Sequence, residues 1–118
     1  MQAEGVPPTD SPVVRGAASE LYSVNRQNTR WRIVDGETVV INLESTHYYS
    51  LNKTGTFVWT FLLEGERSLG EVATAVATHY CQPLQAVLFD VRAVIHELAR
   101  EALVVMRSLP DEKRTEDA

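Results

Sequence analysis

The first half of the chain shows the two-residue alternation of apolar and polar positions that is typical of β-strands. Residues 30–34, RWRIV, alternate along their length, and residues 38–43, TVVINL, are rich in β-branched side chains. Asp35 and Gly36 lie between these segments and predict a tight hairpin turn, because both residue types tolerate a positive φ. A third strand is expected over residues 47–51, HYYSL.

The predicted third strand has an edge without the usual protection. Its alternation places Tyr49 and Leu51 toward the core and Tyr48 on the opposite face. If consecutive strands pair, this strand lies at one edge of a three-stranded antiparallel sheet. Strand edges are commonly protected by charged residues or proline, yet Thr46 to Leu51 contains no Asp, Glu, Lys, Arg or Pro. We therefore expect an edge that another chain can pair with.

Three helices are expected after the strands. Asn52 is a suitable N-cap for the first, which is apolar on nearly all sides. Ser68 and Glu71 form a capping-box pattern at the start of the second. In the third, seven apolar side chains within Leu84–Leu98 recur at intervals of three and four residues. The predicted fold is α+β and winged helix-turn-helix-like: a three-stranded antiparallel sheet followed by three helices.

The expected folded domain covers residues 21–107. Residues 1–20 are rich in Pro, Gly, Ser and Ala without a sustained period, which predicts a flexible arm. Residues 108–118 include Pro110 and mixed charges, which predicts a disordered charged tail. Between these bounds, residues 102–106, ALVVM, either end the third helix or add a short β segment.

The charge of the chain narrows the choice of partners. Its net charge is −5, and 11 basic residues are scattered among 16 acidic ones, so we expect no nucleic-acid partner. No apolar run approaches the roughly 18 residues that span a bilayer, so no membrane partner is expected. The first residues lack the basic start and apolar stretch of a secretory signal, and the expected location is cytoplasmic.

Residues that could support catalysis are few. The three histidines, His47, His79 and His96, lie in different predicted elements without the spacing of metal ligands. No phosphate-binding glycine loop, dinucleotide-binding glycine motif or serine-hydrolase motif is present. We interpret the single cysteine, Cys81, as a small buried side chain beside the turn between the second and third helices. We therefore expect no catalytic activity, no metal site and no cofactor.

An open strand edge beside apolar helices is typical of a peptide receptor, in which an extended ligand adds a strand to the sheet. Five new backbone hydrogen bonds at a net ~0.5–1.5 kcal/mol each give about 3–7 kcal/mol. Micromolar binding requires about 8 kcal/mol, so an adjacent apolar groove must contribute. The third strand and the flank of the third helix are its expected walls.

Two stretches resemble the PqqD-like family of precursor-peptide recognition domains, which serve ribosomally made, post-translationally modified peptides (RiPPs). They are residues 31–80, WRIVDGETVVINLESTHYYSLNKTGTFVWTFLLEGERSLGEVATAVATHY, and residues 90–104, DVRAVIHELAREALV. The resemblance implies a non-catalytic domain that binds the leader segment of a precursor peptide as an added strand. The implied partner is a modifying enzyme such as a radical-SAM protein, or a leader peptidase. The implied contact residues are His47, Tyr48, Tyr49, Ser50 and Leu51 on the strand, with Leu88, Arg92, Ile95 and His96 on the third helix.

The chain departs from this family at Ala102, where many relatives place glycine at the end of the third helix. Two other functions remain open at this point. One is a winged-helix DNA-binding regulator, although the third helix carries as many acidic as basic residues. The other is an interaction subunit that forms a homodimer through its apolar first helix and has no peptide ligand.

Overall fold

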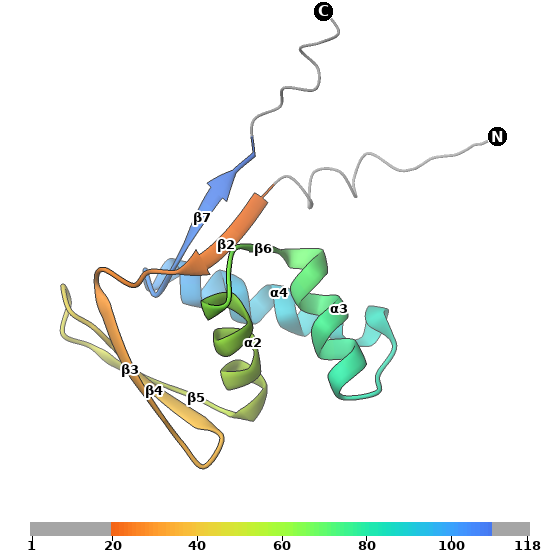
Figure 1. Ribbon diagram of the computed structural model, residues 1–118, viewed down its shortest axis with the longest axis horizontal. Coiled ribbons are helices and arrows are strands. Elements are labelled where there is room, and N and C mark those ends of the chain that lie inside the picture. Colours follow the sequence, from red (N-terminus) through yellow and green to blue (C-terminus); the bar gives the residue numbers. More distant parts are fainter. Residues whose placement is uncertain (1–19, 110–118) are drawn as a thin grey trace, which may run out of the picture.

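The computed structural model describes residues 20–109, which form two small antiparallel sheets and three helices (Figure 1). The predicted arm and tail therefore lie almost entirely outside the described residues. In chain order the elements are β2 (Glu20–Val24), β3 (Thr29–Val34), β4 (Glu37–Asn42), β5 (Tyr48–Leu51), α2 (Lys53–Leu63), β6 (Arg67–Ser68), α3 (Leu69–His79), α4 (Leu84–Arg100) and β7 (Val104–Ser108).

The first sheet has the strand order β3-β4-β5 and confirms the predicted antiparallel meander. Asp35 and Gly36 connect β3 to β4 with φ values of 55° and 78°. Two successive positive φ angles define the turn type whose twist matches that of a hairpin. Three antiparallel strands followed by three helices confirm the α+β fold, whereas the likeness to a winged helix-turn-helix stays a prediction.

The second sheet has the order β6-β2-β7 and brings together segments from both ends of the described chain. β2 pairs with β7 from Glu20↔Ser108 to Val24↔Val104, so the pairing extends one residue beyond each predicted domain boundary. Residues 102–106 therefore do contribute to a β segment. The sequence analysis did not predict β2 or the two-residue β6, because such short strands carry little periodic signal.

α2 and α3 begin where their predicted caps place them. The Asn52 side chain accepts a hydrogen bond from the Gly55 backbone N–H at 2.8 Å, and Ser68 and Glu71 form a reciprocal capping box. α2 lies at the centre of the fold, and its Trp59 side chain has no exposed surface. The Trp31 ring of β3 packs edge-on against Trp59 with 5.7 Å between ring centroids, which joins the first sheet to the helices.

Both α3 and α4 end in a turn that uses a left-handed residue other than glycine. After α4, the Leu103 N–H bonds to the Leu98 carbonyl and the Ala102 N–H bonds to the Ala99 carbonyl, and Ala102 has a φ of 62°. Ala102 thus occupies the position that glycine usually fills at a helix end. The family difference at Ala102 leaves this cap geometry intact.

After α3, Cys81 has the corresponding position with a φ of 55°, and it is exposed to solvent. The interpretation of Cys81 as a buried side chain is therefore wrong. The side chain of a residue just beyond a helix end projects into solvent, and the backbone of that residue forms the hydrogen bonds that end the helix.

Replacement of Ala102 by glycine should stabilise the protein. A non-glycine residue in the left-handed region costs about 1–2 kcal/mol, which exceeds the extra ~0.5–1 kcal/mol of chain entropy that glycine loses on folding. Ala102 is exposed, so no packing is lost. We expect Ala102→Gly to raise the free energy of unfolding in urea by about 0.5–1 kcal/mol. The matched control is Ala93→Gly within α4, which should lower it by about 1 kcal/mol. A loss of stability in both variants would contradict this account.

Candidate functional site

The outer edge of β5 has no strand beside it among residues 20–109, because β5 pairs only with β4. The Asn42 N–H donates to the His47 carbonyl at 2.9 Å, so residues 42 and 47 form a hydrogen-bonded pair. Such pairs alternate along an antiparallel ladder, which assigns Tyr49 and Leu51 to bonds with β4. The N–H and C=O groups of Tyr48 and Ser50 therefore point to the free edge.

The side chains of β5 lie on two faces, as the alternation predicts. The Tyr48 side chain is 71% exposed and Ser50 is also exposed, whereas Tyr49 and Leu51 are half-buried against the core. His47 precedes the strand and is exposed, and its ring lies edge-on to Tyr49 with 6.5 Å between ring centroids. Of the five residues predicted from this segment, Tyr48 and Ser50 direct their backbone groups to the free edge and His47 is exposed beside it, whereas the Tyr49 and Leu51 side chains face the core.

A cavity of about 320 Å³ lies between the end of β5 and the middle of α4. Leu51, Val94 and Leu98 are the large apolar side chains that line it, and the exposed Glu97 side chain also lines it. Gly55 lies at the floor, where a Cβ atom would stand 3.2 Å from the Leu51 Cβ, so a larger residue would narrow the cavity. The full lining is Ser50, Leu51, Asn52, Gly55, Ala93, Val94, Glu97 and Leu98.

The four residues predicted from the third helix lie elsewhere on α4. Ile95 has no exposed surface, and Leu88 is half-buried against the core. Arg92 and His96 are exposed and lie two residues to either side of Val94, which is about 200° around the helix from it. Of the predicted residues, only Ser50 and Leu51 line the cavity, and these four lie outside its lining.

The charge of Arg92 acts on a residue of the second sheet rather than on β5. Burial is the main cause that raises the pKa of Tyr22 in β2, and the positive charge of Arg92 opposes the increase. Arg92 thus acts on the second sheet. An apolar stripe has two polar flanks, and the amphipathic pattern of α4 does not identify the flank that faces β5. The sequence analysis missed Ala93, Val94, Glu97 and Leu98 for that reason.

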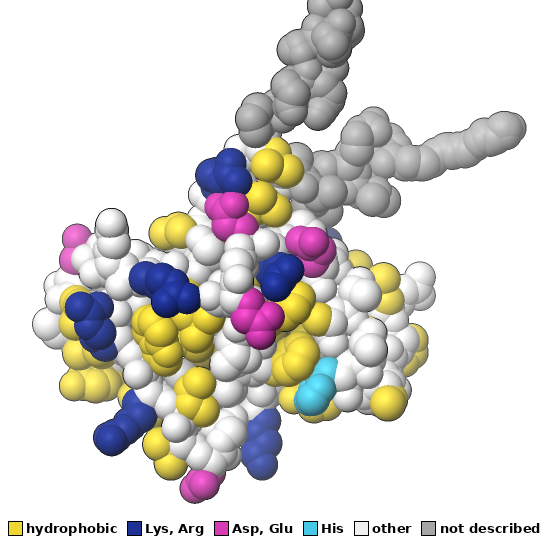
Figure 2. All heavy atoms as spheres, in the orientation of Figure 1, with side chains coloured by type: hydrophobic (Ala, Val, Ile, Leu, Met, Phe, Trp, Pro, Cys, Tyr) yellow, Lys and Arg dark blue, Asp and Glu magenta, His cyan; other side chains and the backbone are white. Residues whose placement is uncertain are grey.

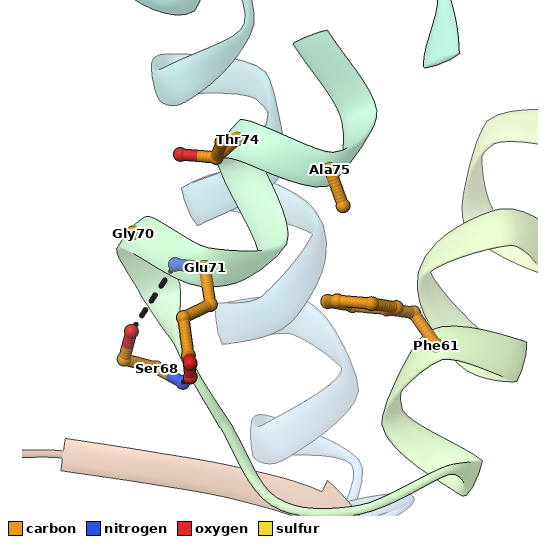
Figure 3. A pocket seen from close by; sticks show the side chains of 6 residues that line it. All are labelled: Phe61, Ser68, Gly70, Glu71, Thr74 and Ala75. Carbon is orange, nitrogen blue, oxygen red and sulfur yellow. Dashed lines mark hydrogen bonds between the residues drawn. The ribbon is translucent and has the colours of Figure 1, made fainter. Parts of the chain in front are cut away.

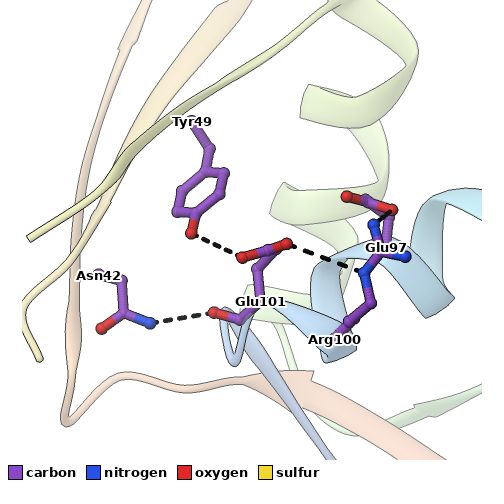
Figure 4. A network of polar contacts seen from close by, with 5 residues as sticks. All are labelled: Asn42, Tyr49, Glu97, Arg100 and Glu101. Atoms are coloured by element: carbon purple, nitrogen blue, oxygen red, sulfur yellow. Dashed lines mark hydrogen bonds and ion pairs between the residues drawn. The ribbon is translucent and has the colours of Figure 1, made fainter. Parts of the chain in front are cut away.

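A polar network joins the end of α4 to the first sheet (Figure 4). The Tyr49 hydroxyl of β5 donates to the Glu101 carboxylate at 2.8 Å. The Asn42 side-chain amide of β4 donates to the Glu101 backbone carbonyl at 3.0 Å, and Asn42 is buried. Arg100 lies beside the same carboxylate, with 3.8 Å between its Nε and a Glu101 oxygen. The network links the C-terminal end of α4 to β4 and β5.

The hydrogen bond to Glu101 is the main cause that raises the pKa of Tyr49 above its usual value of 10.0, with burial as the second cause. The phenol is more strongly protonated in the folded protein than in the unfolded chain. The folded protein is therefore stabilised by this hydrogen bond. The stabilisation is complete at pH values below the pKa of the tyrosine in the unfolded chain, near 10, and it is lost as the pH rises through the higher pKa of Tyr49 in the folded protein.

A larger open cavity of about 530 Å³ lies between α2 and α3, where the Phe61 ring faces Ala75 (Figure 3). Ser68 and Glu71 of the capping box form part of its wall, and their polar groups already bond to each other. No β5 residue lines this cavity. It combines neither an open backbone edge nor unpaired polar groups at the capping box, so it is the weaker candidate for a binding site.

The surface in the orientation of Figure 1 mixes charges of both signs. Positive and negative side chains alternate there with hydrophobic patches over the first sheet and α2, without a continuous basic area among the described residues on this face (Figure 2). In the part of the chain from 20 to 109, no group of three or more His, Cys, Asp and Glu side chains could hold a metal ion. None of the helices described is long and apolar enough to cross a membrane.

Comparisons with known proteins identify a family and similar folds. The model of a family described as Coenzyme PQQ synthesis protein D (PqqD) matches residues 37–104, which is more than half of the chain. A search of curated proteins found no match. The solved structure of TbiB1 in complex with the TbiA(beta) leader peptide is similar at 26% sequence identity, covering 70% of this chain and 93% of that chain with a TM-score of 0.63.

Two more distant structures share the fold. Lasso peptide synthetase B1, complexed with the leader peptide, is 21% identical over 71% of this chain and 96% of that chain, with a TM-score of 0.61. The PqqD truncation of Methylobacterium extorquens PqqCD is described as a functional, stand-alone RiPP recognition element. It is 15% identical over 72% of this chain and 88% of that chain, with a TM-score of 0.58.

Because of the Tyr49–Glu101 hydrogen bond, the free energy of unfolding should decrease as the pH rises above 10. We expect Tyr49→Phe to be less stable than the wild type at pH 8, with a difference that shrinks as the pH rises above 10, because the wild-type advantage needs a protonated phenol. Urea unfolding from pH 8 to 11 measures this difference. Tyr48→Phe is the control, since the Tyr48 hydroxyl is exposed and does not touch Glu101. A pH-independent difference for Tyr49→Phe would contradict the assignment.

Proposed function

The chain belongs to the PqqD family, and on that basis we propose that it binds the leader segment of a ribosomally made precursor peptide in the cleft between β5 and α4. The observation that carries the proposal is the free backbone edge of β5 beside an apolar cavity. Two of the similar structures are described as complexes with leader peptides, which supports the same class of ligand here.

In the proposed complex the leader adds a fourth strand to the first sheet. Tyr48 and Ser50 each offer one N–H and one C=O, and four bonds at a net ~0.5–1.5 kcal/mol give about 2–6 kcal/mol. Micromolar binding needs about 8 kcal/mol before the cost of ordering the peptide is counted. Apolar side chains of the leader must therefore enter the cavity lined by Leu51, Val94 and Leu98.

We assign different roles to the strand residues. Tyr48 and Ser50 bind through their backbone, Leu51 lines the cavity, and Tyr49 holds the cleft open through Glu101. His47 lies at the end of the edge. We place the helical wall at Ala93, Val94, Glu97 and Leu98, because the cavity provides no contact for Leu88, Arg92, Ile95 or His96.

The protein's proposed role is to hold a peptide for another enzyme. Binding of the leader raises the effective concentration of the attached core peptide at the active site of a partner modifying enzyme or leader peptidase. We propose that this chain itself makes and breaks no bond. Backbone pairing suits the task, because it fixes the position of a peptide without demanding a particular side chain at every residue.

The free edge can be tested with a proline at Ser50. Proline removes the backbone N–H, and an edge strand tolerates it where that N–H faces solvent. We expect Ser50→Pro to remain folded and to bind at least tenfold more weakly. The probe is the most enriched peptide from a display library of random 20-residue peptides selected on the wild-type protein. Fluorescence anisotropy measures binding, and circular dichroism measures folding.

Two variants control this experiment. Ser50→Ala keeps the N–H and should bind within twofold of the wild type, whereas Tyr49→Pro should unfold the first sheet, because the Tyr49 N–H bonds to β4. A folded Ser50→Pro protein with unchanged affinity would rule out strand addition at β5.

A further inference from the structure

Another cavity of about 310 Å³ lies along α4, on the N-terminal side of the first one. This second cavity, called the distal cavity below, is lined by Val87, Asp90 and Val91, which lie one to two turns before Val94 on the same side of α4. Thr54 in the first turn of α2 lines its opposite wall. The complete lining is Thr54, Val76, Tyr80, Gln82, Val87, Asp90 and Val91.

The distal cavity differs from the first in its polar groups. Its floor consists of Val76, Val87 and Val91, which are buried, while four polar side chains surround the opening. These are the side chains of Thr54, Tyr80, Gln82 and Asp90, and none of them is hydrogen-bonded to another side chain between residues 20 and 109. A few convergent polar groups over an apolar floor are typical of a site that selects a ligand side chain.

Charge determines which side chain fits. Asp90 forms no ion pair with residues 20–109, whereas Glu97 pairs with Arg100, which also lies beside Glu101. Asp90, Glu97 and Glu101 share one side of α4, since they are spaced by seven and four residues. This side of α4 therefore carries three carboxylates, and the one in the distal cavity forms no ion pair with the part of the chain that the structure describes.

We propose that the distal cavity binds a lysine or arginine side chain of the same peptide that pairs with β5. This inference rests on the proposed function and adds a specificity determinant to it. The long aliphatic stem of either side chain would cover the valine floor, and its charged end would reach the Asp90 carboxylate and the oxygens of Thr54, Tyr80 and Gln82. A hydrogen bond between charged groups is stronger than one between neutral groups.

The geometry also locates this residue within the peptide. Every pairing in the first sheet is antiparallel, and we infer the same direction for the added strand. Peptide residues beyond the Leu51 end of β5 then precede the paired segment. Val87 and Val94 are seven residues apart on α4, about 10 Å, which an extended peptide covers in roughly three residues. The basic residue should therefore stand about two to four positions before the paired segment.

The test uses the same random 20-residue display library, selected in parallel on the wild type and on three variants. Wild-type selection should enrich peptides with alternating apolar residues preceded by Lys or Arg. Asp90→Asn should retain the apolar pattern and lose the basic preference, and Asp90→Lys should replace it with a preference for Asp or Glu. Glu37→Gln, which alters a carboxylate on the hairpin of the first sheet, should select as the wild type does.

A second measurement uses the most enriched wild-type peptide and a copy in which its basic residue is glutamine. The substitution should weaken binding about tenfold on the wild type and on Glu37→Gln, but less than twofold on Asp90→Asn. Equal losses on the wild type and Asp90→Asn would overturn the assignment to Asp90.

The outcomes separate this inference from the proposed function. Selected peptides without a basic preference, or with an aromatic or aliphatic residue at that position, overturn the distal-cavity proposal while strand addition survives. Selected peptides whose affinity is the same on Ser50→Pro overturn strand addition itself, and the distal-cavity proposal falls with it.

Discussion

The attachment of the α4 end to the first sheet sets the spacing between the helix and β5 on which the rest of the proposed site depends. The Tyr49 side chain and the Asn42 side chain reach the same residue, Glu101, one through its carboxylate and the other through its backbone carbonyl. The Asn25 backbone N–H and side-chain amide bond to Leu103 and Ala102 in the turn that follows. These bonds oppose a closer approach of the helix to β5, which burial of the apolar cavity lining would favour, because apolar burial is favourable and non-directional.

The division of the strands into two sheets keeps the edge of β5 accessible. β7 returns to β2 rather than to β5, so the C-terminal strand completes the second sheet and leaves the first with three strands. An exposed strand edge is a hazard, since it can pair with any extended chain. Here the edge is short, with Tyr48 and Ser50 as its only residues whose backbone groups point outward along the strand. Four unpaired backbone groups provide a docking point but limited affinity, so nonspecific pairing remains weak.

The sequence predicted the features that depend on local chemistry. The Asp35-Gly36 turn, the Asn52 cap and the Ser68–Glu71 capping box each involve residues close in the chain, and each is present in the structure. β2 pairs with β7, about 80 residues later in the chain, and the side of α4 that lines the first cavity lies opposite residues about 50 positions earlier. The local sequence patterns of β2 and α4 do not specify these distant partners. The network at Glu101 was missed for the same reason, because its residues come from three separate elements.

In the proposed complex, one cavity along α4 recognises apolar side chains and the other recognises a positive charge. Backbone bonds to β5 are nearly independent of sequence, so choice among peptides must come from side chains on either side of the paired segment. The first cavity would bind apolar side chains, which many peptides contain. The carboxylate of Asp90 would select against many apolar peptides. A bulky apolar residue in the distal cavity would leave polar groups unpaired, and an acidic residue would be repelled by Asp90. A short edge, a permissive cavity and a charged one together yield selectivity that no one of them supplies alone.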